Sequence, residues 1–586
     1  MIRIVAPKGD FDLYEDFAAE LYLNNVMLTD EGEMTVPMTL LPTPNNLRNV
    51  EYGHRIDNYY KPIDSLEVEV HEGSFYSKCR MEIFSISADD GISYALYLNN
   101  GGFAALVGDK KVGDLNWDVI KYSNKYHGAE NLAKSSFAFE FRNLLESNTN
   151  YKFPQVVSTY KYNKRFFNNS SLQLDEGLCI LNEYNIFMNE VEYSSGTLPL
   201  LTKKMTNISQ YGGDTVIQVS NGDKYWCPAH FAIAPFMSFR YFLEKLFNFY
   251  DYSFSYDDFT NYNSSFEKLI LLHHNADTMI RMNWYLDGGY NNCSGTFLES
   301  QIVPNIRIKD VISEIQKNFA GRFIFNKSNK TVKFLFYNDV LTQEPDMDLT
   351  PYMVSRMKIE PRQKTKLRLI NKNVKTEKPE EQTDEKFEVE TIEFNFLPEA
   401  TVIDTMRNKM IDLPNKPIWK NPIKMNMVKI GDIQTTGNKQ DFFYNTTFEI
   451  NNDVPDELLL SYYDENSIKI GRRVYNDVNT GIITDLDEWF KYRTTEKVFS
   501  KLAGTDIDGA EIQYEKYREF KENSNIKITC KMNMPKSVLN NINLQKPKLL
   551  DGQKVLIERI ITVLGRNDIF QVFICRTLRK YRDRPN

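Results

Sequence analysis

The chain has 586 residues, of which 42% are hydrophobic, and it carries a formal net charge of −8. A chain of this length is expected to form several domains with real cores, roughly three to five. The acidic balance argues against a duplex nucleic-acid binder, which usually carries a basic patch. No stretch reaches the roughly 20 apolar residues that a membrane helix needs. The N-terminus lacks the apolar core of a signal peptide, so we expect a soluble protein made in the cytoplasm.

Aromatic residues are unusually frequent, with 34 Tyr and 38 Phe. Together with Thr, Val and Ile, these residues favour strands and half-buried surfaces. The predicted fold class is therefore mainly β with α/β insertions (α+β).

Residues 1–150 predict a barrel-like N-terminal β domain. A strand in ELYLNNVML leads to a turn at Asp30–Gly32 and to a second strand, EMTVPMTLL, in which Pro37 indicates an edge strand or a bulge. The segment LEVEVHEGSFYSKCRMEIFSIS predicts a hairpin about Glu72–Gly73. SYALYLNNGGFAALV predicts a further strand pair with Asn99–Gly102 as its turn.

Residues 151–228 show little periodicity and predict an irregular, loop-rich insertion. After them, residues 229–350 predict two helix-strand α/β modules, because FLEKLFNFYDYSFSYDD and VISEIQKNFAGRFIFNK share one pattern at an offset of 69 residues. In each, a helical apolar stripe changes to the alternation of a strand. Low identity leaves open whether the repeat is a duplication or a coincidence of two common units.

The apolar stripes define the expected buried faces of the two helices. They consist of Phe239, Phe242, Leu243, Leu246, Phe247 and Tyr250 in the first helix, and Ile308, Val311, Ile312, Ile315 and Phe319 in the second. Strand positions follow at Tyr252, Phe254 and Tyr256, and at Phe323 and Phe325. Gly321 stands where a helix C-terminal cap is expected, and a hairpin turn at 326–330 leads to the returning strand TVKFLFY.

Residues 351–450 predict a mixed segment whose charged stretch EKPEEQTDEK forms an exposed loop. Residues 451–586 predict a C-terminal β-barrel domain. Within it, KVLIERIITVLGRNDIFQVFICRTL is typical of a hairpin with its turn at Gly565–Asp568, and Cys575 is expected to be a small buried hydrophobe.

Candidate catalytic and metal-binding residues are few. His273 and His274 are followed by Asp277, but adjacent histidines on a strand point to opposite faces and do not easily share a metal. The six cysteines are far apart without a CxxC pair, which indicates neither a disulfide framework nor a zinc cluster. The acidic clusters Asp257–Asp258 and Asp485–Glu488 lack an identifiable partner.

The segment NGDKYWCPAH offers a sugar-binding platform at Tyr225, Trp226 and His230, although packed aromatics at a strand end explain it more simply. We find no nucleophile elbow, zinc-protease motif, dinucleotide fingerprint or phosphate-binding loop. The sequence therefore predicts no catalytic, cofactor-binding or metal-binding residue, and no enzyme.

Leu28 to Tyr60 reads LTDEGEMTVPMTLLPTPNNLRNVEYGHRIDNYY. It resembles the opening segment of tail proteins from tailed phages and prophages of Bacteroides-type gut bacteria, in which an acidic-Gly turn precedes a strand ending in Leu-Pro-Thr-Pro-x-Asn. The matching positions are Glu31, Gly32, Leu41, Pro42, Thr43, Pro44, Asn45, Asn46, Gly53 and Arg55. APFMSFRYFLEKLFNFYDYSF, the second helix with its hairpin, and the closing LLDGQKVLIERIITVLGRNDIFQVFICRTLRKYRDRP are similar to parts of baseplate hub proteins, which also occur in contractile injection machines.

The resemblance implies two β-barrel hub domains with small helix-strand modules, assembled as a homotrimer whose ring joins the tail tube to the tail tip of a virion. Its expected partners are the tube and other baseplate proteins, and DNA would pass through the ring without sequence-specific binding. The family supplies no catalytic motif. The chain also ends soon after the last barrel segment, which argues against a cell-wall-degrading extension.

We expect Pro42, Thr43, Pro44, Asn45 and Asn46 to form a rigid turn at a subunit or partner contact, because each proline fixes its own φ and restricts the residue before it. An ordinary stiff loop is the alternative. For the whole chain, two other functions stay open: a carbohydrate- or receptor-binding β protein at the tail tip or cell surface, and an enzyme acting on glycans or peptidoglycan.

Overall fold

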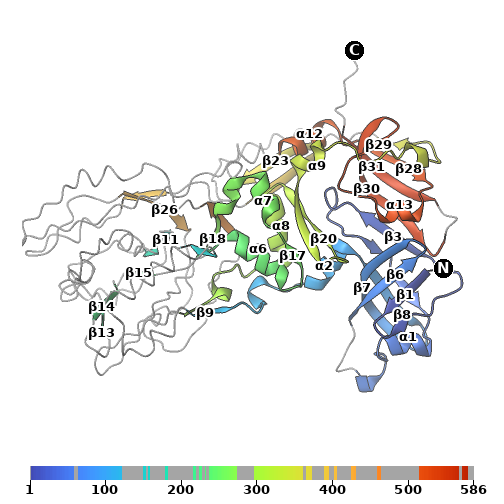
Figure 1. Ribbon diagram of the computed structural model, residues 1–586, viewed down its shortest axis with the longest axis horizontal. Coiled ribbons are helices and arrows are strands. Elements are labelled where there is room, and N and C mark those ends of the chain that lie inside the picture. The colour runs from blue at the N-terminus through green and yellow to red at the C-terminus, as the bar shows by residue number, and fades with distance from the viewer. Residues whose placement is uncertain are drawn as a thin grey trace, which may run out of the picture.

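The computed structural model describes most of the two ends and the middle of the chain (Figure 1). The described ranges are 2–58, 64–121, 150–152, 236–272, 296–360, 365–371, 388–394, 458–462, 514–566 and 570–578. Seven further short strands are placed by their backbone: β11 (Val156–Ser158), β12 (Cys179–Leu181), β13 (Thr215–Gln218), β14 (Lys224–Cys227), β15 (Phe231–Ala232), β25 (Thr401–Asp404) and β26 (Lys424–Ile430).

The structure is mainly β, as predicted, and its largest element is an antiparallel sheet of 13 strands. The hydrogen-bonded order is β2-β1-β6-β7-β8-β4-β3-β30-β31-β28-β22, with β29 beside β30 and β5 beside β8. The strands are β1 (Ile2–Ala6), β2 (Gly9–Asp10), β3 (Ala19–Asn24), β4 (Met34–Thr35), β5 (Met38–Leu40), β6 (Ser65–Glu72), β7 (Phe75–Ser87), β8 (Gly91–Tyr97), β22 (Lys358–Ile359), β28 (Lys527–Met532), β29 (Lys548–Leu550), β30 (Gln553–Leu564) and β31 (Gln571–Thr577).

Both ends of the chain contribute to this one sheet. β3 pairs with β30 from Ala19 opposite Leu564 to Asn24 opposite Arg559, so the blue N-terminal and red C-terminal strands lie side by side in Figure 1. Two hydrophobic cores pack against the sheet, one in the N-terminal half around Ile4 and one in the C-terminal half around Phe573. The strands that the sequence analysis places in separate N- and C-terminal domains are therefore continuous across β3 and β30.

Several local predictions are confirmed. Residues 73 and 74 connect β6 to β7, with Gly73 in the left-handed region at φ 58°, where a side chain is disfavoured. Pro37 interrupts its strand, which is split into β4 and β5. β30 and β31 form the expected C-terminal hairpin, although residues 567–569 of its turn lie outside the described part. Cys575 is fully buried, and burial raises the pKa of its thiol.

The predicted hairpin turn at Asn99–Gly102 is wrong, because these residues begin helix α2 (Asn99–Val107). The physical reason is the tertiary fit of this helix against the segment before β4. A Cβ on Gly101 would lie 2.5 Å from the carbonyl oxygen of Glu33, while Leu98 N donates to that same oxygen at 2.9 Å. Glycine thus permits a close approach of two backbones here, and packing overrides its preference for turns.

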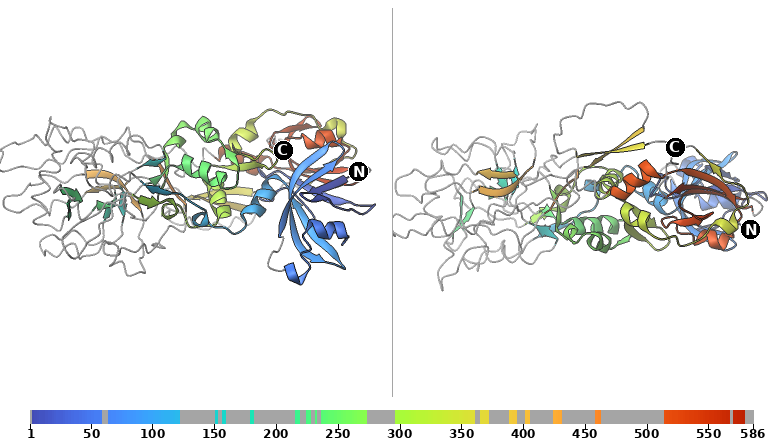
Figure 2. Two further views of the ribbon diagram at one scale, coloured as in Figure 1. Left: turned by 60° about the horizontal axis from the view of Figure 1, so that its bottom comes forward. Right: turned by 90° about the horizontal axis from the view of Figure 1, so that it is seen from above.

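The middle of the chain forms an α/β module (α6 to α9) whose three-stranded sheet has the order β17-β21-β20. Figure 2 shows this module as a separate layer beside the large sheet. Its elements are α6 (Phe239–Asn248), β17 (Ser253–Phe254), α7 (Asp257–Tyr262), α8 (Ile308–Asn318), β20 (Gly321–Asn326), β21 (Thr331–Phe336) and α9 (Tyr337–Thr342). Both predicted helices and the second predicted strand are confirmed, and of the predicted helical stripes only Ile312 is not buried. The first strand is shorter than predicted, because β17 contains Phe254 but ends before Tyr256, which is the N-cap residue of α7.

The two helix-strand units correspond closely at the predicted offset. α6 begins at Phe239 and α8 at Ile308, and each helix ends before a left-handed residue, Asp251 at φ 59° and Ala320 at φ 47°. The cap expected at Gly321 is therefore displaced by one residue. Gly321 instead starts β20, where a Cβ would lie 2.5 Å from Leu335 O. The correspondence ends at the strands, since β17 pairs in parallel with β21 whereas β20 pairs antiparallel with it.

An aromatic core fills the module. The rings of Phe239 and Phe319 stack with centroids 5.4 Å apart, and the ring of Phe247 lies 5.1 Å from that of Phe323. These pairs join equivalent helices and strands of the two units, so neither unit can bury its apolar face without the other. Aromatic pairs of this kind contribute beyond the area they bury.

Shorter elements surround these two bodies. They are helices α1 (Pro44–Asn49), α12 (Glu515–Asn523) and α13 (Lys536–Asn540), and the strand pairs β9 (Val119–Lys121) with β19 (Thr296–Leu298), β10 (Tyr151–Lys152) with β16 (Phe236–Met237), β18 (Leu269–Leu272) with β27 (Leu459–Tyr462), and β23 (Thr365–Asn371) with β24 (Glu388–Phe394). Short 3-10 turns lie at Ile56–Asn58, Val112–Asp114, Ser264–Lys268, Glu299–Gln301 and Thr350–Tyr352. In the part of the chain that the structure describes, no helix combines the length and apolar character needed to cross a membrane.

The packing makes a prediction about the module core. Leu246 and Ile315 are both 0% exposed, so replacing either by Ala leaves a cavity and should lower the free energy of unfolding by about 2–5 kcal/mol. Asn248→Ala, on the exposed side of α6, is the matched control and should stay within about 0.5 kcal/mol of wild type. Urea unfolding measures both. A Leu246→Ala protein as stable as the control would contradict the packing described here.

Candidate functional site

The N-terminal motif forms the start of helix α1. Thr43 caps this helix by accepting a hydrogen bond from Asn46 N at 3.1 Å, and Pro44 occupies the first helical position, where its missing N–H costs nothing. Asn46 Nδ2 donates to the carbonyls of Asp12 and Leu41, both at 2.9 Å, and its Oδ1 accepts from Asp12 N at 2.7 Å. The predicted turn is therefore a capped helix start held by asparagine hydrogen bonds.

The residues after α1 present apolar side chains to solvent. We call residues 50–58 the contact loop. Its backbone is strained, because Glu51 at φ 55° and Tyr52 at φ 54° are both left-handed without being glycine. Ile56 is 89% exposed and Tyr52 is 37% exposed, whereas Asn46 is fully buried in its own chain. Among the described residues of 28–60, the contact loop thus holds the most exposed large apolar side chain, that of Ile56.

A second feature is a buried carboxyl group at the N-terminus of α2. Glu33 Oε2 accepts a hydrogen bond from Asn100 N at 3.2 Å, and the carboxyl group also accepts one from the side chain of Asn99. Burial raises the pKa of Glu33 to about 7, against the opposing effect of these hydrogen bonds. Glu33 therefore titrates near neutral pH, where an exposed glutamate is fully ionised.

The two asparagines next to Glu33 satisfy the free edge of β20. Asn100 Nδ2 donates to Phe323 O at 2.7 Å and its Oδ1 accepts from Phe325 N at 3.1 Å, so one side-chain amide replaces the peptide group of a neighbouring strand. Asn99 Oδ1 accepts from Lys327 N at 3.3 Å. Lys327 itself is 4% exposed and pairs with Glu67 of β6 at 2.7 Å. These contacts, which we call the junction, dock the α/β module on the large sheet.

A third cluster lies at the opposite side of the module around Glu299, which is 0% exposed. Its carboxylate accepts hydrogen bonds from Asp118 N and Tyr241 OH, both at 2.9 Å, and from Tyr151 OH, and it forms an ion pair with Lys245. Burial and the bond to Glu299 raise the pKa of Tyr151. Both oxygens of this carboxylate are used, which fixes α6 to the strand pairs β9–β19 and β10–β16.

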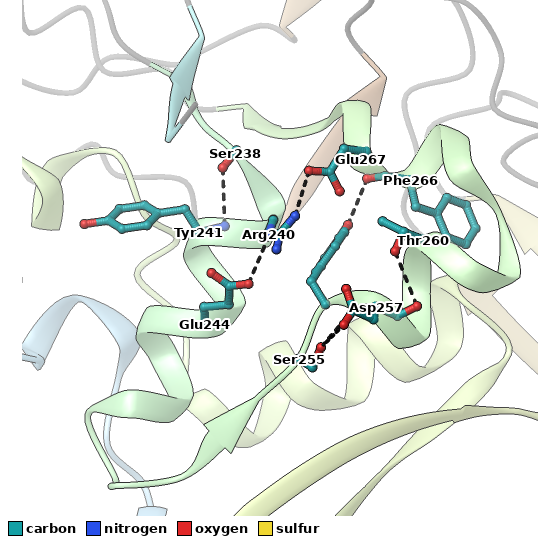
Figure 3. A network of polar contacts seen from close by, with 10 residues as sticks. Ser238, Arg240, Tyr241, Glu244, Ser255, Asp257, Thr260, Phe266 and Glu267 are labelled. Atoms are coloured by element: carbon teal, nitrogen blue, oxygen red, sulfur yellow. Dashed lines mark hydrogen bonds and ion pairs between the residues drawn. The ribbon is translucent and has the colours of Figure 1, made fainter. Parts of the chain in front are cut away.

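The polar residues around the start of α6 are also structural (Figure 3). Ser238 caps α6 by accepting from Tyr241 N at 3.3 Å, and Arg240 bridges Glu244 and Glu267 at 3.0 Å each. The candidate cluster Asp257–Asp258 belongs to the first turn of α7. There Asp258 accepts a hydrogen bond from Phe334 N at 2.9 Å and thereby ties α7 to β21.

The described residues hold no group of three His, Cys, Asp or Glu side chains that could bind a metal ion. The other candidates, His230, His273, His274, Asp277 and Asp485–Glu488, and the charged stretch at 377–386, lie outside the described residues. For Tyr225 and Trp226 only the backbone of β14 is described. Comparison of the chain with models of known protein families and with curated proteins gave no match.

Sequence reasoning missed Glu33, Lys327, Lys245 and Glu299, because each meets its partners far along the chain. Lys327 lies 228 residues from Asn99, and Glu299 lies 148 residues from Tyr151. A single charged residue gives no signal of such pairing, whichever element it is predicted to lie in. The one available hint was Asn99-Asn100-Gly101-Gly102, which fits a polar helix start as well as it fits a turn.

The Glu299 cluster predicts a stability change. Glu299→Ala leaves Lys245 and two tyrosine hydroxyls without their buried partner, and should lower the free energy of unfolding by about 3–5 kcal/mol. Arg240→Ala removes two exposed ion pairs and is the control, with an expected loss of about 1 kcal/mol or less. Thermal and urea unfolding compare the two. Equal losses in both variants would show that the buried cluster contributes no more than a surface ion pair.

Proposed function

We propose that the protein is a structural hub at the distal end of a phage tail or tail-like injection machine. In this role it forms a ring that joins the tail tube to the tail tip, and it performs no catalysis. The proposal rests on the resemblance of residues 28–60 and of the closing C-terminal hairpin to baseplate hub proteins. The structural observation that supports it most is the single sheet formed by both ends of the chain, to which the α/β module is docked by buried polar contacts.

A hub must resist distortion when the tail transmits force, and the two ends of the chain are well placed for this. Six consecutive residue pairs join β3 to β30, so separating the two halves requires breaking a whole strand interface. We propose that each of the two cores of the large sheet corresponds to one hub barrel. Three copies with two such units each would give pseudo-sixfold symmetry, which matches a hexameric tube, and heterologous contacts between copies close into a ring.

The proposed partners are the tail tube and other baseplate proteins, and the proposed location is the tail of the particle. A net charge of −8 disfavours binding of the channel wall to DNA that passes through it, because DNA is also negatively charged. The contact loop, which follows the Pro42–Asn46 motif, is the proposed surface for a subunit or partner, because it presents Ile56 and Tyr52 on a backbone fixed by α1.

Copy number and position test this function directly. We expect a reconstruction of the particle to place three copies on the tail axis, between the tube and the tip. Mass measurement of the purified protein, alone and mixed with neighbouring tail proteins, shows whether the ring forms without them. One copy, or six equivalent copies, on the axis would contradict the proposal, as would absence of the protein from purified particles.

The contact loop gives a sharper prediction. Ile56→Asp places a charge on a residue that is 89% exposed, so the fold should tolerate it, whereas an assembled apolar contact should not. We expect the variant to melt like wild type. Its incorporation into particles should fall at least tenfold, because replacing a buried contact residue of an interface costs about 2 kcal/mol or more of binding free energy.

Val389→Asp is the matched control, because Val389 is an exposed apolar residue, at 52%, on β24 and away from the motif. It should be incorporated normally. Normal incorporation of Ile56→Asp would show that the loop contacts nothing in the particle. A loss with both variants would point to a general effect of added charge.

A further inference from the structure

We propose that the protonation state of Glu33 controls the junction, and we call this carboxyl group the latch. When the carboxyl group is protonated, the first turn of α2 is held against β20. When it is ionised, this contact loosens. The inference concerns a property of the folded chain and does not depend on the proposed function. It rests on a continuous set of hydrogen bonds from the carboxyl group to the edge of the α/β module.

The Glu33 carboxyl group is buried. Glu33 is 7% exposed and sits between the large sheet and α2, where Leu98 N donates to its backbone oxygen at 2.9 Å. The backbones of Glu33 and Gly101 are so close that a single Cβ would not fit between them. Water that enters between Glu33 and Gly101 must therefore separate α2 from this segment.

Two asparagines connect Glu33 to β20. Besides the backbone N–H of Glu33 itself, the Asn99 side chain and the Asn100 backbone N–H donate to the Glu33 carboxyl group. The side chains of the same two asparagines accept from Lys327 N and Phe325 N. A shift of the first turn of α2, which carries both asparagines, thus withdraws the acceptors of two amides at once, one in β20 and one just after it. Those amides then face solvent, because β20 is the edge strand of its sheet on this side.

The charged groups around Glu33 are paired with other residues. α2 contains no charged residue. On the segment of Glu33 itself, Asp30 pairs with Arg322 at 2.7 Å and Glu31 pairs with Arg559. From the β20–β21 turn, Lys327 faces the junction but is held by Glu67. Tyr97 of β8 is uncharged at neutral pH, and burial raises its pKa further. Among the described residues no cation is thus available to compensate an ionised Glu33, whose hydrogen-bond donors are all neutral.

The direction of the pH effect follows from linkage. The pKa of Glu33 is raised by burial from 4.5 to about 7 in the closed junction, so the closed state binds the proton more tightly than an opened state with an exposed glutamate. The latch is therefore fully closed below pH 4.5 and weakens as the pH rises through 7. Well above pH 7, Glu33 is ionised in both the closed and the opened state, so a further rise in pH does not weaken the junction any more.

Hydrogen exchange of the full chain tests the latch, because Phe325 N and Lys327 N report directly on the junction. Their protection factors, corrected for the intrinsic pH dependence of exchange, should fall on the order of 50-fold between pH 5 and pH 8. The helical amide of Leu246, which is buried in the module core, should not change. Glu33→Gln keeps the acceptor without the charge and should hold the protection of both junction amides constant over this range.

Glu31→Gln is the matched control, since it removes an exposed carboxylate two residues away and should retain the wild-type pH dependence. Wild-type protection factors of the two junction amides that do not change between pH 5 and pH 8 would overturn the proposal. This wild-type measurement is decisive even if Glu33→Gln does not fold. A Glu33→Gln protein with the wild-type profile would assign the pH dependence to another group and equally overturn it.

Discussion

The attachment of the α/β module to the large sheet depends on how the free edge of β20 is satisfied. An edge strand presents unpaired N–H and C=O groups that must find partners when they are buried. Here the amide of Asn100 pairs with both Phe323 O and Phe325 N. Because Asn100 belongs to the helix that leaves the large sheet, its side chain helps to position the α/β module relative to that sheet. Edge pairing by a side chain also prevents the strand from recruiting another chain.

A second buried asparagine fixes how the two halves of the large sheet join. Asn25 follows β3 and is 0% exposed, and its Nδ2 donates to Leu544 O at 2.6 Å and to Ile557 O at 2.8 Å. Its backbone N donates to Glu558 O at 2.9 Å, next to the bulge of β30 between Ile557 and Arg559. A one-residue slip of β3 on β30 would leave this amide buried without partners, which costs more than the lost contacts. The same residue type thus sets both the register of the sheet and the docking of the module.

The elements that were predictable from the sequence are those whose signal is local. The stripe of Phe239 to Tyr250 and the turn at Gly73 depend on neighbours within a few residues, and both are found as predicted. The helix at Asn99 was not predictable, because Gly101 serves a close backbone approach to Gly32 and Glu33 rather than a turn. The polar clusters were not predictable either, since Glu299 and Glu33 acquire their environments from segments that only the fold brings together.

Two buried carboxyl groups attach the α/β module at its two sides, and they differ in whether their negative charge is compensated. Glu299 receives a lysine, two tyrosine hydroxyls and a backbone N–H, so its charge is compensated and that attachment is fixed. Glu33 receives only neutral donors, so its charge is not compensated and that attachment responds to protons. Buried polar groups add little net stability compared with apolar packing, but they specify one geometry. The aromatic core therefore holds the module together, while the two carboxylates determine where it is attached and which attachment can open.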